Sequence, residues 1–327
     1  MKRYIKMVAA LLALMASFTA CENGDQAFDD YEGGTTVMFV YQSPVRTIVL
    51  GDDEYDTSID KEHKCKIKAT FGGSYNGSKG YVNVAVDNRL CDHLTFADGT
   101  PVKAMPAEYY SLSTNKLDFK GGMTGETVVQ LTDAFFNDPD AVKNTYVIPL
   151  VMTDQQGFDR ISVGTPKEGV TAVRTNYANW YTTPKDYVMY CVKYQNKYSG
   201  WWLTHHNTST DNIEKASKVQ ITTRTLNSSV YSVEFQEGST IYKADLLLTF
   251  DANEKCTITS LTDGVTATGS GSWADDAIHS WNNKDRDLME LNAEITFAGG
   301  VKKSLNEKLV WWRSGVTSEE FSYTYNN

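Results

Sequence analysis

The chain has 327 residues, of which 41% are hydrophobic and 12% aromatic, and it carries a formal net charge of −10. This length and apolar content suffice for two domains that each bury a core of their own. The acidic balance argues against nucleic acid as a partner, because a negatively charged chain is repelled by phosphate groups.

The first 20 residues have the pattern of a secretory signal peptide. Three basic residues within the first six positions precede an apolar run over residues 7–15, which is too short to span a bilayer, and small residues follow. Cys21 comes next, as in a bacterial lipobox, where the signal is cut before a cysteine that is then acylated. Phe18 stands where Leu is more usual. We expect lipidation at Cys21; the alternative is a secreted protein with a chance cysteine there.

Residues 21–35 form a polar, acidic, glycine-containing segment that is typical of a flexible tether. An acidic stretch directly after the lipidated cysteine resembles the signal that sends lipoproteins of gut Bacteroidetes to the outer face of the cell. Removal of residues 1–20 takes away three basic residues and no acidic one, which leaves 28 basic and 41 acidic side chains and a net charge of −13. We therefore expect a protein anchored by lipid in the outer membrane at the cell surface.

Residues 36–165 read as short strands with alternating apolar and polar residues, separated by turns rich in glycine and asparagine. The strand-like runs are 37–42, 46–50, 65–71, 81–86, 109–113, 127–131, 145–152 and 159–163. The segment after Leu131 has room for one helical turn. So many short strands in this length predict an immunoglobulin-like sandwich. A connector with glycine and proline follows over residues 166–186.

Residues 187–327 predict a second all-β domain with a different composition. All seven tryptophans of the chain lie at or after position 180. The strand-like runs are 187–194, 200–206, 218–226, 230–236, 242–250, 256–261, 287–297 and 305–313. Eight strands with short turns predict a closed up-and-down barrel. Gly200-Trp201-Trp202 and the late Arg313 resemble a lipocalin signature, which implies a structural role in which Trp202 plugs the barrel and Arg313 lies over its ring.

Four cysteines remain once Cys21 is set aside. In an exported protein they could form the disulfides Cys65–Cys91 and Cys191–Cys256. Cys65, however, alternates with apolar residues on the buried face of its predicted strand, which favours free buried thiols. We expect no metal site and no cofactor, because the cysteines and histidines lack metal-ligand spacing.

Three segments of the first domain, at 81–88, 105–113 and 127–154, are similar to a module of Bacteroidetes outer-membrane lipoproteins. That immunoglobulin-like module has no assigned biochemical role. It commonly precedes a ligand-facing domain in proteins encoded with polysaccharide-utilisation machinery, and the second half of this chain resembles the lipocalin-like domain that sometimes follows it. The resemblance implies glycan as a partner, membrane lipid at Cys21, and a place beside a surface transporter complex.

The candidate glycan-binding residues lie between positions 273 and 282. Exposed tryptophan rings stack on the apolar faces of sugars, and polar side chains fix the hydroxyl groups. Trp281 lies in a polar segment that reads as a loop, and Trp273 enters the same loop from its other side. The polar partners would be Asp275, Asp276, His279 and Asn282. The alternative is that either ring folds back to cap the barrel.

Catalysis is not expected from the sequence. Glycosidases place two carboxylates about 5–9.5 Å apart across a cleft, and acidic loop residues such as Asp285 and Asp287 are common in so acidic a chain. No nucleophile-elbow or zinc-protease motif occurs. The prediction is a surface protein that captures glycan without cleaving it. The alternatives are an adhesin or structural surface protein, and a lipocalin-like carrier of a small apolar ligand.

Overall fold

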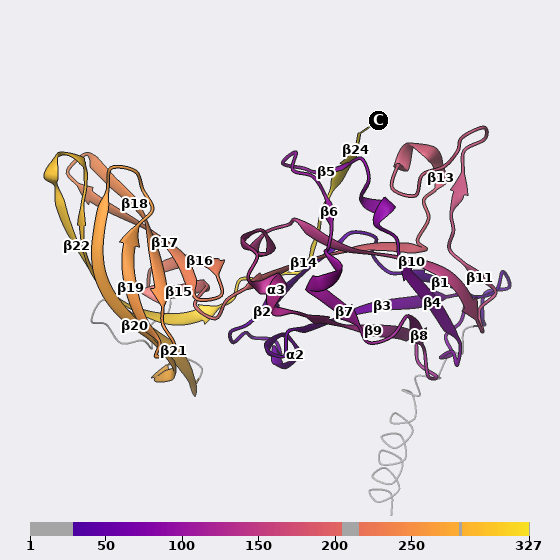
Figure 1. The fold of residues 1–327 in the computed structure, drawn as a ribbon. Helices are drawn as coiled ribbons and strands as arrows, with labels where there is room; N and C mark the ends of the chain where they lie inside the picture. Colours follow the sequence, from indigo (N-terminus) through magenta and orange to yellow (C-terminus); the bar gives the residue numbers. More distant parts are fainter. Residues whose placement is uncertain (1–28, 205–215, 281–282, 327) are drawn as a thin grey trace, which may run out of the picture.

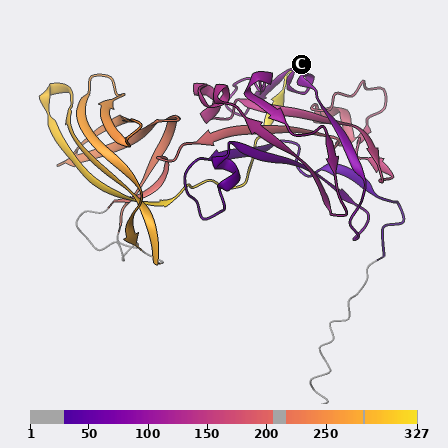
Figure 2. The same ribbon diagram turned by 60° about the horizontal axis from the view of Figure 1, so that its bottom comes forward.

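The computed structural model describes residues 29–204, 216–280 and 283–326. They form two β-rich bodies, a layered sandwich and a barrel, joined by a narrow junction (Figure 1). The same dumbbell outline is seen after rotation (Figure 2). The all-β prediction of a sandwich followed by a barrel is confirmed. Within the described ranges, no helix has the length and apolar character needed to cross a membrane.

The sandwich contains a five-stranded and a seven-stranded sheet. The first sheet has the order β11 (Arg160–Ile161), β1 (Thr36–Phe39), β3 (Lys64–Gly72), β9 (Thr124–Leu131), β7 (Tyr110–Leu112). The second has the order β23 (Glu319–Glu320), β2 (Pro44–Val49), β14 (Tyr187–Gln195), β10 (Tyr146–Gln156), β4 (Tyr81–Val86), β8 (Lys116–Asp118), with β6 (Lys103–Ala104) paired to β10. Small sheets β12 (Thr165–Pro166) with β13 (Trp180–Thr182), and β5 (Leu94–Phe96) with β24 (Tyr323–Tyr325), complete it.

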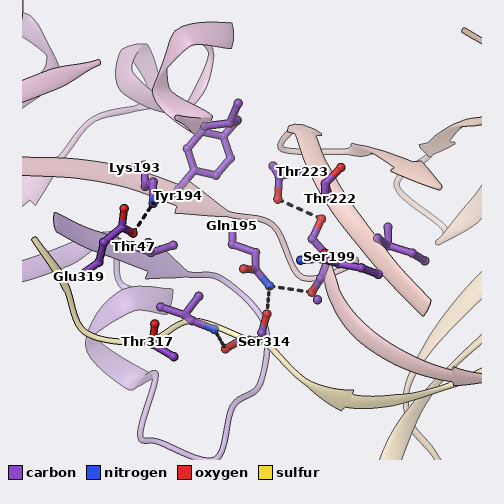
Figure 3. Close-up of a pocket in the computed structure, with 16 residues that line it drawn as sticks. Thr47, Lys193, Tyr194, Gln195, Ser199, Thr222, Thr223, Ser314, Thr317 and Glu319 are labelled. Carbon is purple, nitrogen blue, oxygen red and sulfur yellow. Dashed lines mark hydrogen bonds and ion pairs between the residues drawn. The ribbon is translucent and has the colours of Figure 1, made fainter. Parts of the chain in front are cut away.

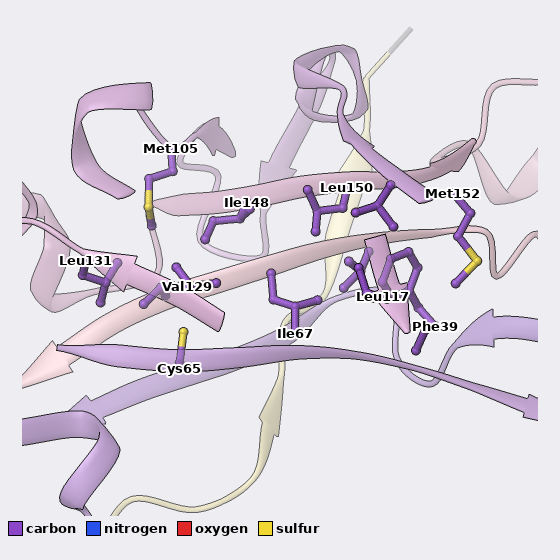
Figure 4. Packing of buried hydrophobic residues seen from close by; sticks show 14 of the residues in the cluster. Phe39, Cys65, Ile67, Met105, Leu117, Val129, Leu131, Ile148, Leu150 and Met152 are labelled. Atoms are coloured by element: carbon purple, nitrogen blue, oxygen red, sulfur yellow. The ribbon is translucent and has the colours of Figure 1, made fainter. Parts of the chain in front are cut away.

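The core of the sandwich lies between its two main sheets (Figure 4). In β3, every second side chain from Cys65 onward is buried, because successive strand residues point to opposite faces. In β10, by contrast, seven consecutive residues from Tyr146 are buried, since this central strand is covered on both faces. Periodicity alone therefore marks β3 more clearly than β10.

Short helices occur only in connections of the described chain. They are α2 (Ser58–Lys61), α3 (Asp133–Phe136), η2 (Asn88–Cys91), η3 (Ala107–Tyr109), η4 (Pro139–Val142), η5 (Tyr177–Asn179) and η8 (Ala298–Gly300). The helical turn predicted after Leu131 is present as α3, and η4 follows it.

The barrel closes with eight consecutive strands, as an up-and-down barrel must. They are β15 (Gly200–Thr204), β16 (Lys218–Thr225), β17 (Ser228–Glu237), β18 (Thr240–Phe250), β19 (Lys255–Ser260), β20 (Thr266–Ser280), β21 (Lys284–Thr296) and β22 (Lys302–Arg313). Inward-facing aromatic and aliphatic side chains, among them Trp202, Phe250 and Leu246, form one buried cluster that fills the interior.

Two parts of the expected barrel domain lie in the sandwich instead. The run 187–194, expected as the first barrel strand, is β14, which pairs antiparallel with β10 and parallel with β2. The C-terminal tail also returns to the sandwich, where β23 pairs with β2 and β24 with β5. The barrel domain expected over 187–327 thus reduces to strands between positions 200 and 313.

With β14 in the sandwich, β20 supplies the eighth strand of the barrel. We expected this segment to be mostly loop because it is rich in glycine, serine and aspartate. The glycines have a structural cause. A Cβ atom at Gly269 or Gly271 would lie 2.3 Å from a carbonyl oxygen of β21, Asn292 or Glu290 respectively. These two strands approach too closely for a side chain at either position.

The four cysteines of the described chain are free and buried, which confirms the preference for thiols over disulfides. Burial raises the pKa of the Cys65 and Cys191 thiols to about 12. Such groups stay protonated and pack as small apolar side chains.

Candidate functional site

A polar pocket of about 270 Å³ lies at the junction of the sandwich and the barrel (Figure 3). It is lined by the end of β14, by β16 and by the segment that follows β22. Its principal side chains are Thr47, Lys193, Tyr194, Gln195, Ser199, Gln220, Thr222, Thr223, Ser314, Thr317 and Glu319. We call it the junction pocket.

The chain crosses between the two bodies twice, and both crossings border this pocket. Gln195 ends β14 on the first crossing, and its Nε2 donates to the carbonyl oxygens of Ser199, at 2.9 Å, and Ser314, at 3.2 Å. Ser314 lies on the returning crossing. At Gly200 the backbone φ is +132° and a Cβ atom would lie 2.7 Å from the carbonyl oxygen of Arg313, so this close approach requires glycine.

A buried asparagine holds the first crossing in place. Asn196 is 1% exposed, and its Nδ2 donates to the carbonyl oxygens of Thr225, at 2.7 Å, and Ser228, at 3.0 Å. Its Oδ1 accepts from the Ser199 hydroxyl at 2.7 Å, and Thr223 Oγ1 in turn donates to Ser199 Oγ at 2.9 Å. These bonds preorganise the polar wall of the pocket on the barrel side.

The sandwich side of the pocket carries one ion pair. Lys193 Nζ lies 3.0 Å from Glu319 Oε2. Burial alone would raise the pKa of Glu319, but hydrogen bonds from Lys193 and Asn144 outweigh it and lower that pKa, so the carboxylate remains ionised.

Three polar side chains of the pocket are open to a ligand. Among the described residues, Gln220, Thr222 and Thr317 have no side-chain hydrogen-bond partner, and all three are exposed. Val316, which is half-buried, supplies apolar surface beside them. The pocket can therefore donate to and accept from a neutral, hydroxyl-bearing molecule while it covers the apolar face of that molecule.

The predicted exposure of Trp273 on a loop is wrong. Trp273 lies within β20, is 8% exposed and belongs to the barrel core. Its ring packs edge-to-face with that of Tyr198, with ring centroids 5.7 Å apart and an angle of 89° between the ring planes. Lys197 Nζ lies 4.2 Å from the Trp273 ring centroid. The ring points inward because the segment is a strand, so the alternative that it folds back into the barrel describes it better.

The other candidate residues are not gathered around that ring. Trp281 and Asn282 lie outside the described residues. His279 is exposed near the tip of the β20–β21 hairpin, where its Nδ1 lies 2.8 Å from Asp285 and its Nε2 lies 3.1 Å from Asn283 Oδ1.

Asp275 and Asp276 belong to a cluster of four carboxylates with Asp52 and Asp287, whose oxygens lie within 4.8 Å of one another. Asp287 is buried, which raises the pKa of its carboxyl to about 7 even though the Asp276 N–H donates to it at 3.2 Å. Sequence reasoning missed this cluster, because Asp52 comes from a loop of the sandwich. Oxygen ligands of this kind suit hard divalent cations, but nothing further among the described residues points to a ligand, so we assign no metal there.

The expected contact between Trp202 and Arg313 is also wrong in part. Trp202 is fully buried in the barrel, where its Nε1 donates to the Tyr198 carbonyl oxygen at 3.2 Å. The Arg313 guanidinium instead lies 4.2 Å from the ring of Trp312. The register explains this difference: Arg313 pairs with Trp201, the neighbour of Trp202 that points to the opposite face.

Two family models match this chain. A domain of unknown function, DUF5627, matches residues 187–315, and an N-terminal domain model matches residues 30–159. None of the curated proteins compared with the chain matches it.

Solved structures from Bacteroides ovatus are similar to the chain to different degrees. A multidomain protein that includes DUF1735 has a TM-score of 0.39 at 10% identity, covering 89% of this chain and 94% of its own. A candidate carbohydrate-binding protein of strain ATCC 8483 has a TM-score of 0.22 at 11% identity, covering 89% and 98%. Likenesses this low carry no argument here.

A third Bacteroides ovatus structure is much more similar. It is a protein of unknown function with 30% sequence identity and a TM-score of 0.81, and the match covers 91% of this chain and 100% of that one. The present chain belongs to the same family as that Bacteroides ovatus protein of unknown function.

Proposed function

We propose that this protein captures glycan at the cell surface without cleaving it, and that the junction pocket is where it does so. The observation that carries the proposal is the set of open hydroxyl and amide side chains, Gln220, Thr222 and Thr317, around a preorganised concave wall. Sugars offer many groups that both donate and accept hydrogen bonds, and neutral side chains of this kind match them without a charge to desolvate.

The pocket is equipped to bind glycan and not to hydrolyse it. Glycosidases use two carboxyl groups, one as acid and one as nucleophile or base. Among the residues that the structure describes, Glu319 is the only carboxylate that lines the junction pocket, and its ion pair with Lys193 keeps it ionised. None of the four aspartates of the cluster lines the junction pocket.

The carrier alternative has less support than glycan capture. A lipocalin-like carrier holds its ligand inside the barrel, whereas the interior here is occupied by Trp202, Phe250, Trp273 and their neighbours. An adhesin or structural role would leave the junction pocket without a glycan ligand, and the experiment below separates it from capture.

The location belongs to the same proposal. Acylation at Cys21, which lies outside the described residues, would hold the protein in the outer membrane at the cell surface, in position to serve polysaccharide utilisation beside a surface transporter complex. Single-site affinities in the micromolar to millimolar range, about 4–8 kcal/mol, would suit this role, because many weak sites on one surface still retain a polymer.

Affinity electrophoresis of residues 22–327 on a panel of soluble polysaccharides tests the proposal. We expect one or more polysaccharides to retard the wild type. The double variant Gln220→Ala/Thr222→Ala should lose about 30-fold in affinity, since each of the two lost hydrogen bonds contributes roughly 1 kcal/mol.

A matched variant on the barrel exterior, Thr257→Ala/Thr259→Ala, should behave as wild type, because both side chains are exposed on β19 and remote from the pocket lining. Retardation that survives both Gln220→Ala/Thr222→Ala and a pocket-filling Thr222→Trp would place the site elsewhere. If no polysaccharide retards the wild type, glycan capture is wrong and the adhesin or structural role replaces it.

A further inference from the structure

We propose, on the basis of the glycan-capture function above, that the site extends from the junction pocket into a second pocket on the sandwich, and that its ligand is a neutral oligosaccharide of at least two sugar units. The second pocket measures about 530 Å³, about twice the volume of the first. We call it the sandwich pocket. Its polar lining residues are Asp98, Thr100, Lys103, Asp140, Lys143, Asn144, Thr145 and Lys193.

The two pockets share a wall. Lys193 and Val142 line both of them, so the two volumes are adjacent, with these two side chains between them. The Glu319 carboxylate binds across the same boundary: it pairs with Lys193 at 3.0 Å and accepts from Asn144 Nδ2 at 3.3 Å. A ligand that passes over the Lys193 side chain would occupy both pockets.

Asn144 supplies an unused acceptor in the sandwich pocket. Its Nδ2 is committed to Glu319, but its Oδ1 is buried and has no hydrogen-bond partner among the described residues. A buried acceptor without a donor costs on the order of 1–3 kcal/mol. The Oδ1 atom is closed to solvent in this structure, so a sugar hydroxyl would satisfy it once the Asn144 side chain turns toward the pocket that it lines. That contact would be specific to the second subsite.

The charges around the sandwich pocket favour a neutral ligand. Lys143 and Lys103 both face Asp140, at 2.9 Å and 3.8 Å. Asp98 accepts from Thr100, and Lys193 is held by Glu319. Carboxylates of the protein thus largely neutralise the lysine charges, so an acidic sugar would have to compete with these existing partners. The hydroxyl groups of a neutral sugar can use the same donors and acceptors without displacing them.

Calorimetry with fragments of one to six residues, from partial hydrolysis of starch, xylan and galactomannan, tests the extension on residues 22–327. We expect affinity to rise at least tenfold between one and three residues in one or more series. Asn144→Ala should remove most of that gain, about 3–10-fold, while the single sugar binds as before. The matched exposed variant Asn292→Ala should leave every affinity unchanged.

Three results would overturn the extension. Affinity independent of length would confine the ligand to one pocket, and an Asn144→Ala loss that is equal for one sugar and for longer fragments would mean that Asn144 acts through Glu319 alone. Absence of binding by every fragment would also reject it; retardation by polysaccharides in the electrophoresis experiment then shows whether capture itself still stands.

Discussion

The Gln195 side-chain amide donates to the backbone carbonyl of Ser314 at 3.2 Å, and this bond links the two segments on which the chain crosses between sandwich and barrel. A second contact reinforces the link, since Ser314 Oγ donates to Asp53 in the sandwich. Hydrogen bonds therefore hold the junction in addition to the two covalent crossings. A pocket formed between two bodies can be preorganised only if their relative orientation is held in this way.

Replacement of Gln195 should loosen the junction. Gln195→Ala removes two donors to backbone carbonyls that lie in a partly buried place, so we expect the free energy of unfolding to fall by about 1–3 kcal/mol. Glycan affinity should fall with it. Urea unfolding measures the first effect, and the exposed Gln236→Ala on β17 is the control. Unchanged stability would mean that the covalent crossings alone hold the two bodies.

The C-terminal tail should stabilise the sandwich, although the barrel strands separate the two in sequence. Phe321 is 6% exposed and packs on Phe96 with ring centroids 5.1 Å apart, beside the strand pair of β24 with β5. Phe321→Ala should cost about 3–5 kcal/mol, as truncations of buried aromatic residues do. Tyr181→Ala, at a side chain 69% exposed, should change little. Equal midpoints for both variants in thermal unfolding would contradict a docked tail.

The four thiols should react only after unfolding. Burial raises the pKa of Cys91 and Cys256, as it does for the other two, so the nucleophilic thiolate is scarce and inaccessible in the folded state. For residues 22–327 we expect no labelling by a thiol reagent under native conditions and four labels per chain in denaturant. Fewer than four labels in denaturant without reductant would show that a disulfide is present.

The sequence predicts the fold better than the site, for reasons that differ between elements. Alternation identified β3 correctly because one face of it is buried and the other exposed. It could not assign β14 to a domain, because pairing with β10 and β2 is a long-range property that no local pattern records. In β20, glycines that the close strand packing requires read as loop signals.

The site was harder to foresee because its groups come from distant segments. Thr222 and Thr317 are ordinary threonines in the sequence, and only the return of the tail to β2 brings them around one pocket. Exposure of tryptophan was also misjudged at Trp273, since a polar neighbourhood in sequence does not determine which face of a strand a ring takes.

Truncation of Trp273 should act on stability and not on glycan directly. The ring is buried against Tyr198 in the barrel, so Trp273→Ala should cost about 3–5 kcal/mol of unfolding free energy. Trp273→Phe retains an aromatic ring in the core and should bind polysaccharide as wild type does when both are folded. A folded Trp273→Phe variant that no longer binds would return the site to the β20–β21 hairpin, and Trp281→Ala would then be the next variant to measure.

The buried Asp287 carboxyl should make stability depend on pH in an unusual direction. Its folded-state pKa is raised to about 7 from 3.8, chiefly by burial, with nearby Asp52 and Asp275 acting in the same sense. Between these values the folded state binds the proton more tightly than the unfolded chain. The contribution of this group is therefore fully present below about pH 4 and is lost as the pH rises through about 7.

Asp287→Asn should remove this dependence, because the amide stays neutral at every pH. Relative to wild type, the variant should gain on the order of 1–3 kcal/mol between pH 5 and pH 8, since each pKa unit corresponds to about 1.4 kcal/mol. Urea unfolding at the two pH values measures this difference, and the exposed Asp263→Asn should show none. If the unfolding free energies of Asp287→Asn and wild type change in parallel between the two pH values, the Asp287 carboxyl is ionised over this range in the folded protein. Burial then does not raise its pKa to about 7.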